Sequence, residues 1–150
     1  MCPDFSSLPK EKETFTRCFG CGQDNPIGLK LKFVWDGETA KAEFIPGEVF
    51  QGWPGLTHGA IVITLLDEVM SYACYYAGFN TVTGRISANL KKPVPIGEHL
   101  TLIARITRKT RKLLETGGEV LFSNGEVAAE GTGTMYILDK NRHYAEGCEQ

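Results

Sequence analysis

Two adjacent carboxylates follow an apolar run, and they are the side chains of this sequence best suited to chemistry. Asp67 and Glu68 come directly after residues 60–66, in which Thr64 is the one polar residue. An ionised carboxylate in apolar surroundings usually pairs, shifts its pKa or takes up a proton, and such groups concentrate at sites of chemistry. We therefore predict that Asp67 acts as a general base or as a carboxylate nucleophile. The alternative for Asp67 is a buried acid that is hydrogen-bonded to a loop amide or to a tyrosine, Tyr72 or Tyr75, of a partner subunit, whereas Glu68 is expected to pair with basic strands.

A His-Gly pair opens the same segment. Gly59 falls in the first turn of a predicted helix, where N–H groups lack intrahelical acceptors and the helix dipole favours negative charge. Such an N–H can stabilise an oxyanion, and a residue without Cβ lets a carbonyl group approach the backbone. Ordinary helix-entry geometry is the alternative reason for Gly59. His58 is expected to orient the loop, cap the helix or hydrogen-bond a substrate, rather than to transfer protons.

The helix that carries these residues is predicted over 59–77, and Gly78 ends it. Asp67 and Ser71 are four residues apart and share one face. At about 100° per residue, the apolar side chains cover an arc of roughly 220°, wider than an ordinary amphipathic stripe. The members of this arc are Ile61, Val62, Ile63, Leu65, Leu66, Val69, Met70, Ala73 and Cys74.

The remaining elements are strands. Alternating apolar residues over 29–35 and 40–44, with Asp36-Gly37 between them, predict a hairpin. Four further strands are predicted near 82–92, 99–109, 112–123 and 126–138, which gives the α+β order β-β-α-β-β-β-β. A flat sheet cannot cover so wide an apolar arc, whereas a curved antiparallel sheet of about six strands wrapped around the helix can. That arrangement is called the hotdog fold.

Bulk composition limits the class of protein. With 150 residues and 42% hydrophobic residues, the chain has the size of one domain. We expect a loosely ordered arm at 1–17, the domain at 18–138 and a tail at 139–150. The formal charge of −2 argues against nucleic-acid binding. The apolar run is far shorter than the roughly 20 residues of a membrane span, and no signal-peptide core is evident, which favours a cytoplasmic protein.

Basic residues are concentrated in one part of the chain. Residues 85–112 hold half of the sixteen Lys and Arg residues against one acid, Glu98. The cluster is interpreted either as a solvated rim of strand ends or as a landing site for a phosphorylated small ligand. Its members are Arg85, Lys91, Lys92, Arg105, Arg108, Lys109, Arg111 and Lys112.

The pair Cys18-x-x-Cys21 allows three interpretations. A structural zinc site normally needs four ligands, and the other cysteines and histidines offer no second paired motif, although two subunits together would supply four thiolates. A redox pair is the second interpretation. The favoured one is a tight loop before the first strand, without metal. Five cysteines without secretory context indicate reduced thiols rather than a disulfide framework.

With these motifs in hand, the chain resembles hotdog-fold acyl-CoA thioesterases of the phenylacetyl-CoA and hydroxybenzoyl-CoA type. The resemblance covers roughly residues 18–138. It rests on Cys18-Phe19-Gly20-Cys21-Gly22 with Asn25-Pro26-Ile27-Gly28-Leu29, on Gln51-Gly52-Trp53-Pro54-Gly55, on His58-Gly59 with Asp67 nine residues after the histidine, and on Lys92-Pro93-Val94-Pro95-Ile96-Gly97.

The resemblance implies hydrolysis of acyl-CoA without a cofactor, with Asp67 as the catalytic acid residue of the family and Gly59 as the oxyanion amide. Ser71 would help to position water or substrate, and Gln51 would match a loop glutamine of the family. The family's usual His-Gly-Gly is here His-Gly-Ala60, which changes the room beside the thioester.

The resemblance also implies a homodimer, or a dimer of dimers, with each active site at the subunit interface. The CoA phosphates would lie outside on basic residues, for which we name Arg85, Lys91, Lys92 and Arg108. Two alternatives on the same fold stay open. One is a non-hydrolytic acyl-CoA binding or sensing module. The other is an acyl-CoA hydratase, which the absence of that family's Asp…His pair disfavours.

Overall fold

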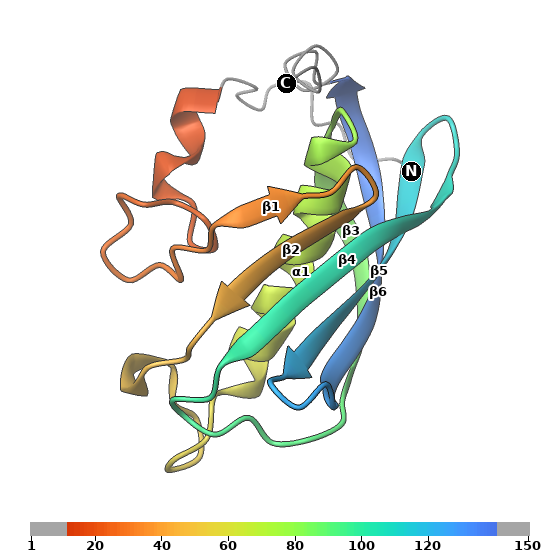
Figure 1. Ribbon diagram of the computed structural model, residues 1–150. Coiled ribbons are helices and arrows are strands. Elements are labelled where there is room, and N and C mark those ends of the chain that lie inside the picture. Colours follow the sequence, from red (N-terminus) through yellow and green to blue (C-terminus); the bar gives the residue numbers. More distant parts are fainter. Residues whose placement is uncertain (1–11, 141–150) are drawn as a thin grey trace.

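One long helix lies against the inner face of a six-stranded antiparallel sheet (Figure 1). The structure, a computed structural model, describes residues 12–140. The strand order is β1-β2-β4-β5-β6-β3, so that β1 and β3 form the two edges. The elements are η1 (Lys12–Arg17), β1 (Phe33–Trp35), β2 (Thr39–Phe44), η2 (Glu48–Phe50), α1 (Gly59–Tyr76), β3 (Phe79–Leu90), β4 (Leu100–Lys109), β5 (Leu113–Phe122) and β6 (Val127–Lys140).

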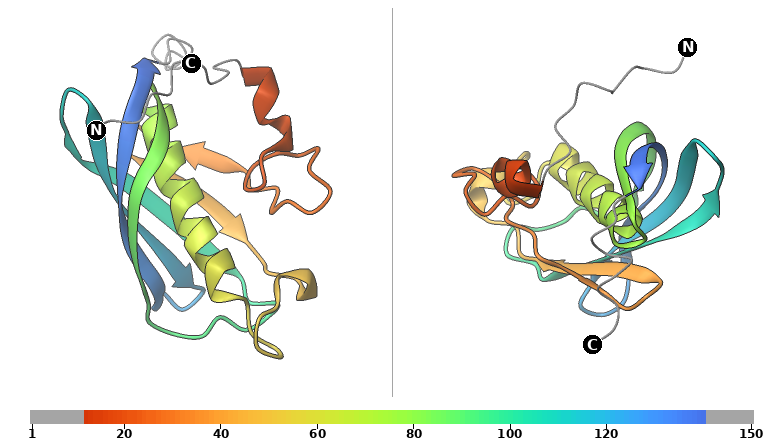
Figure 2. Two further views of the ribbon diagram at one scale, coloured as in Figure 1. Left: turned by 180° about the vertical axis from the view of Figure 1, so that it is seen from behind. Right: turned by 90° about the horizontal axis from the view of Figure 1, so that it is seen from above.

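The predicted helix and its ends are confirmed. His58 is the N-cap residue, and its Nδ1 accepts a hydrogen bond from the Ala60 N–H at 3.0 Å. The helix stops at Tyr76, and Gly78 follows with φ of 97°, a left-handed conformation that glycine adopts without strain. The sheet curves around α1, which accounts for its wide apolar arc (Figure 2).

A row of small residues across the inner face of the sheet lets α1 approach closely. Five residues pair in register on five neighbouring strands, and all of them are alanine or glycine. Leu66 and Met70 of α1 fill the space above them: a Cβ at Gly131 would lie 3.4 Å from Leu66 Cδ1, and one at Gly118 would lie 3.1 Å from Met70 Cγ. The row consists of Ala40, Ala104, Gly118, Gly131 and Ala88.

The first strand is shorter than predicted. Residues 29–35 were expected to be extended, but β1 begins at Phe33 because the preceding residues bond elsewhere. Leu29 N–H donates to Phe19 O at 2.8 Å and Leu31 N–H donates to Gly20 O at 3.0 Å, while Lys30 between them has φ of 54°. The segment before β1 is thus tied to the cysteine-containing loop rather than to the sheet.

The arm at 1–17 and the tail at 139–150 lie largely outside the described residues. Within them, η1 covers Lys12–Arg17 and β6 continues to Lys140. In the described part of the chain, the helices are too short or too polar to cross a membrane.

Candidate functional site

The two adjacent carboxylates of α1 point to different neighbours. Asp67 is half-buried, and its Oδ1 accepts a hydrogen bond from the Thr83 hydroxyl on β3 at 2.6 Å. Glu68 faces the loop that precedes β1, where its Oε1 lies 3.8 Å from Cys18 Sγ. The prediction that Glu68 pairs with basic strands is therefore wrong. One carboxylate belongs to the β3 side of the helix and the other to the N-terminal loop.

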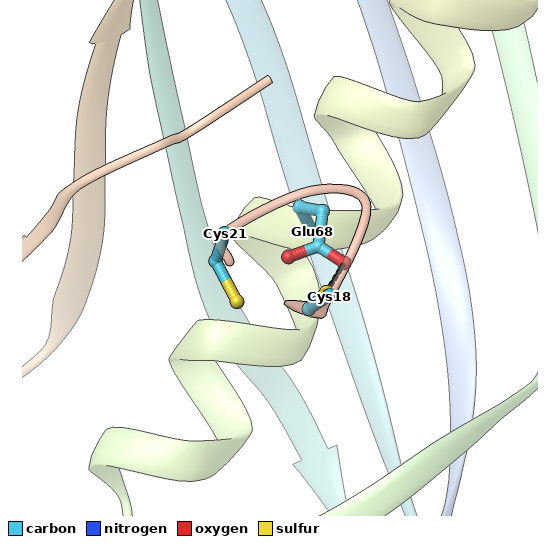
Figure 3. A group of neighbouring side chains, drawn as sticks. All are labelled: Cys18, Cys21 and Glu68. Atoms are coloured by element: carbon cyan, nitrogen blue, oxygen red, sulfur yellow. Dashed lines mark hydrogen bonds between the residues drawn. The ribbon is translucent and has the colours of Figure 1, made fainter. Parts of the chain in front are cut away.

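Glu68 is held between α1 and the loop that carries Cys18 and Cys21 (Figure 3). A side chain at Gly20 would overlap the Glu68 carboxylate, so the loop backbone lies directly over it. Burial is the main reason that the pKa of Glu68 is raised to about 8, and the neighbouring Cys18 and Asp67 add to the effect. The group is therefore mostly protonated at neutral pH when it has no cationic partner.

The two cysteines share a hydrogen bond that makes them unequal. A hydrogen bond from Cys21 lowers the pKa of Cys18 to about 5, and the backbone N–H groups of Cys21 and Gly20 contribute in the same direction. Donating this hydrogen bond, together with burial, raises the pKa of Cys21. Cys18 is therefore the thiol that ionises first.

Gly22 closes this loop, and we expect its substitution to destabilise the protein. A methyl group there would overlap the backbone of Cys18 and Thr16, which has no flexible end that can move aside. Gly22→Ala is expected to lower the free energy of unfolding by about 1–3 kcal/mol in denaturant titrations. Gly47→Ala is the matched control, because a methyl group there meets nothing within 4 Å and φ is −87°. Equal effects of the two substitutions would contradict this account.

The start of α1 leaves one backbone donor free. Ala60 N–H donates to the His58 ring, while the N–H groups of Ile61 and Val62 both donate to His58 O, at 2.9 and 3.3 Å. Among the described residues, nothing accepts a hydrogen bond from Gly59 N–H. A Cβ at Gly59 would lie 3.1 Å from Leu90 Cδ1 at the end of β3, a tight contact with the flexible end of an exposed side chain. His58 therefore caps the helix, one of the roles predicted for it.

The remaining predicted site residues lie in the loop before α1 and further along α1 itself. Gln51 turns into its own loop, where its Oε1 accepts a hydrogen bond from Gly55 N–H at 2.8 Å. Ser71 lies one turn after Asp67 and is half-buried. Trp53, at the tip of the loop, is 78% exposed. The chain thus brings Gln51, His58 and Gly59 together at the helix start, and Asp67 with Ser71 further along.

Asp67 lies far from Gly59 within one chain. They are eight positions apart, and a helix rises about 1.5 Å per residue, so they are roughly 12 Å apart along the axis. A carboxylate that attacks a carbonyl carbon must come within about 3–3.5 Å of it. One chain therefore cannot place both groups directly on the same carbonyl.

Three of the four basic residues named for the CoA phosphates already face glutamates. Lys91 lies 3.1 Å from Glu130, Lys92 pairs with Glu126, and Arg108 lies 3.7 Å from Glu115. These pairs are solvent-exposed and therefore contribute little stability. Lys92 also lines a hollow of about 450 Å³ beside the turn between β5 and β6. The assignment of these residues stays a prediction.

Two neighbours of the carboxylates were missed in the sequence. Thr83 precedes a register shift between β3 and β6, which simple alternation of strand residues does not locate. Glu68 meets Cys18 across 50 residues, a contact that no local pattern signals. The glycines at 20 and 22, where the backbone must approach other atoms, were the one available hint.

Comparison with known families assigns the central part of the chain. The family model described as the thioesterase superfamily matches residues 54–129, which are 76 of the 150 residues. The matched segment contains all of α1, β3, β4 and β5.

Curated relatives are similar over different shares of their length. Acyl-coenzyme A thioesterase THEM4 of Xenopus laevis is 30% identical over 90 residues, which are 59% of this chain and 39% of that protein. THEM4 of Bos taurus is 22% identical over 138 residues, which are 90% of this chain and 57% of that protein. The aligned parts thus span between two fifths and three fifths of the length of these relatives.

Solved structures share the architecture at low sequence identity. A Streptococcus mutans protein bound to acetyl CoA superposes with a TM-score of 0.71 at 21% identity, over 75% of this chain and 91% of that one. The E. coli PaaI protein from the phenylacetic acid degradation operon gives 0.70 at 18% identity, over 75% and 83%. These likenesses, with the six-stranded sheet and its helix, confirm the predicted hotdog fold.

Proposed function

This chain belongs to the thioesterase superfamily, and from that membership we propose that it hydrolyses acyl-CoA thioesters to a free acid and CoA. The observation that carries the proposal is the free N–H of Gly59 at the start of the helix that bears Asp67. Both groups are of the kinds that acyl transfer requires: a donor for the developing oxyanion and a carboxylate for the attack.

In the proposed reaction, the Gly59 N–H donates a hydrogen bond to the thioester oxygen. The amide is preorganised, since the other N–H groups of the first turn are already bonded to His58. Charge that develops on the oxygen then meets a fixed donor and the positive end of the helix dipole. The close approach of the Leu90 side chain to Gly59 is compatible with this role.

Asp67 supplies the attack, either by activating water or by forming an acyl-carboxylate intermediate. In the first route, Asp67 takes a proton from water while the oxygen bonds to the acyl carbon, and the C–S bond breaks as CoA leaves with a proton. In the second route, Asp67 Oδ bonds to the acyl carbon as the C–S bond breaks, and CoA leaves as a thiolate that takes up a proton. Water then cleaves the anhydride, which releases the free acid and restores Asp67. The hydrogen bond from Thr83 fixes the carboxylate in either route, and Ser71 is one turn away for water or substrate.

The proposed active site is shared between two subunits. The roughly 12 Å between Gly59 and Asp67 of one chain is too long for direct attack, as derived above from the helix rise. Two antiparallel copies of α1 would bring Gly59 of one chain to Asp67 of the partner subunit, twice per dimer. The proposal therefore includes a homodimer, or a homotetramer made of two such dimers, and it keeps the sequence-based prediction of a cytoplasmic location.

Acyl-CoA is the proposed substrate class, and basic residues at the rim bind its phosphates. Support comes from the S. mutans relative in this fold, whose structure contains acetyl CoA. Arg85, Lys91, Lys92 and Arg108 are the proposed contacts, because guanidinium and ammonium groups pair with phosphate through charge-assisted hydrogen bonds.

The test is thiol release from a panel of short, medium, long and aromatic acyl-CoAs. Release of CoA that rises with enzyme concentration is expected for at least one acyl class. Acyl-CoA binding without release from any member of the panel would overturn the hydrolytic proposal in favour of a non-hydrolytic binding or sensing module.

A further inference from the structure

Three side chains outside the proposed catalytic machinery bring metal-ligating atoms together. The Sγ atoms of Cys18 and Cys21 and a carboxylate oxygen of Glu68 all lie within 4.8 Å of one another (Figure 3). Zinc binds sulfur at about 2.3 Å and carboxylate oxygen at about 2.0–2.2 Å, so tetrahedral geometry separates two such ligands by roughly 3.5 Å. The distance of 3.8 Å from Cys18 Sγ to Glu68 Oε1 is close to this value.

The cluster has more acidic groups than it has positive charge to balance them. Two thiols and a carboxylate meet in a partly buried place, and none of the described cations pairs with Glu68. A buried carboxylate without a partner is costly unless it takes up a proton or binds a cation. A divalent cation would balance all three groups at once.

Backbone hydrogen bonds hold the loop that carries both cysteines. Gly22 N–H donates to Cys18 O at 2.8 Å, and Leu31 N–H donates to Gly20 O at 3.0 Å. The Tyr72 ring lies near Cys21 and is fixed by stacking on Phe33 at a centroid distance of 3.9 Å. Such outer contacts orient ligands in metal sites and tune their affinity. The absence of a side chain at Gly20 lets this loop lie directly over Glu68.

We propose that Cys18, Cys21 and Glu68 of a single chain bind one divalent cation of the zinc type, with water in the fourth position. Thiolate ligands select zinc over magnesium or calcium, and an S₂O set in tetrahedral geometry fits zinc. The sequence alone favoured a metal-free loop, because it offered no second cysteine pair. The missing ligand is the carboxylate 50 residues away. A bound cation would join the loop to α1 beside Asp67.

Cobalt titration tests this proposal independently of thioester hydrolysis. The protein is prepared with reductant and stripped of metal, in a Cys2→Ser, Cys148→Ser background that removes the cysteines outside the described residues. Co²⁺ is expected to bind at one ion per chain with sulfur-to-cobalt charge-transfer absorption and the visible bands of a tetrahedral site, and Zn²⁺ should abolish both. Cys18→Ser or Cys21→Ser should remove roughly half of the charge-transfer intensity, because each thiolate contributes separately.

Two further variants distinguish the carboxylate from the thiols. Glu68→Gln should keep the charge-transfer band and weaken cobalt affinity about tenfold or more. Cys74→Ala is the control, because this buried cysteine lies outside the cluster and its loss should leave the spectrum unchanged. Far-ultraviolet circular dichroism establishes that each variant is folded before titration.

Three results would overturn the proposal. One is the absence of a charge-transfer band in the reduced, folded protein. Another is one cobalt per two chains with the intensity of four thiolates, which would instead support a site shared between subunits. The third is a Cys18–Cys21 disulfide that persists in reductant and prevents cobalt binding.

Discussion

Asp67→Asn is expected to lower kcat for acyl-CoA hydrolysis by about 10²- to 10⁴-fold, the usual contribution of a positioned general base. Asparagine keeps the size of the side chain and still accepts the hydrogen bond from Thr83, so the fold should be unaffected. It neither removes a proton from water nor attacks a thioester. The measurement is the rate of thiol release at saturating substrate, with the free energy of unfolding and the affinity for CoA recorded on the same samples.

Asp24→Asn is the matched control for this experiment, because Asp24 is exposed and outside the site. Its kcat should equal that of the wild type. If Asp67→Asn still hydrolyses acyl-CoA at the wild-type rate, and continues to do so when Glu68 is also replaced, Asp67 is not the catalytic carboxylate. The thioesterase assignment itself would survive that result, because the wild-type protein would still release CoA.

Leu66→Ala is expected to lower the free energy of unfolding by about 2–5 kcal/mol. We expect a value near the upper end of that range. Leu66 is fully buried on α1, and it fills the space above Gly131 of the small-residue row. Alanine leaves a cavity there. The glycines and alanines below have no side chains that can swing into it, and a site that collapses poorly loses the most stability.

Ile27→Ala is the control for this substitution, because it removes the same number of carbon atoms from a side chain that is 72% exposed. Its effect on the free energy of unfolding should stay within about 0.5 kcal/mol. Both variants are compared by denaturant titration. A loss below about 1 kcal/mol for Leu66→Ala would show that the sheet closes onto the helix after all.

Local patterns predicted the elements of this fold well. The helix at 59–76 follows from a long apolar run with a capping residue and a terminal glycine, and the first hairpin follows from alternating apolar residues on either side of Asp36-Gly37. The hotdog arrangement follows from the width of the apolar arc, which only a curved sheet covers. Asp67 and Gly59 were named as site residues for the same reason, since both belong to this helix, and their roles stay predictions.

Contacts between distant segments could not be predicted in this way. The strand expected from Leu29 starts late, because residues 29–31 bond to Phe19 and Gly20. Asp67 and Glu68 are adjacent in sequence, yet they face Thr83 and Cys18 respectively. The first of these depends on a register shift in β3 and the second on how a loop folds over a helix. Neither contact produces a periodic pattern of residue types in the sequence.

The strand order has a consequence for the kinetics of folding. Strands β4, β5 and β6 form a meander joined by short turns, so their pairing closes small loops and can occur early. The helix α1 lies in the chain between β2 and β3, which attach to opposite sides of that meander. Both ends of α1 are anchored only after β2 and β3 have paired with the meander. Each of these pairings brings together residues that are far apart in the sequence. We therefore expect the helix that carries both carboxylates to reach its final position late, after the β4-β5-β6 meander has formed.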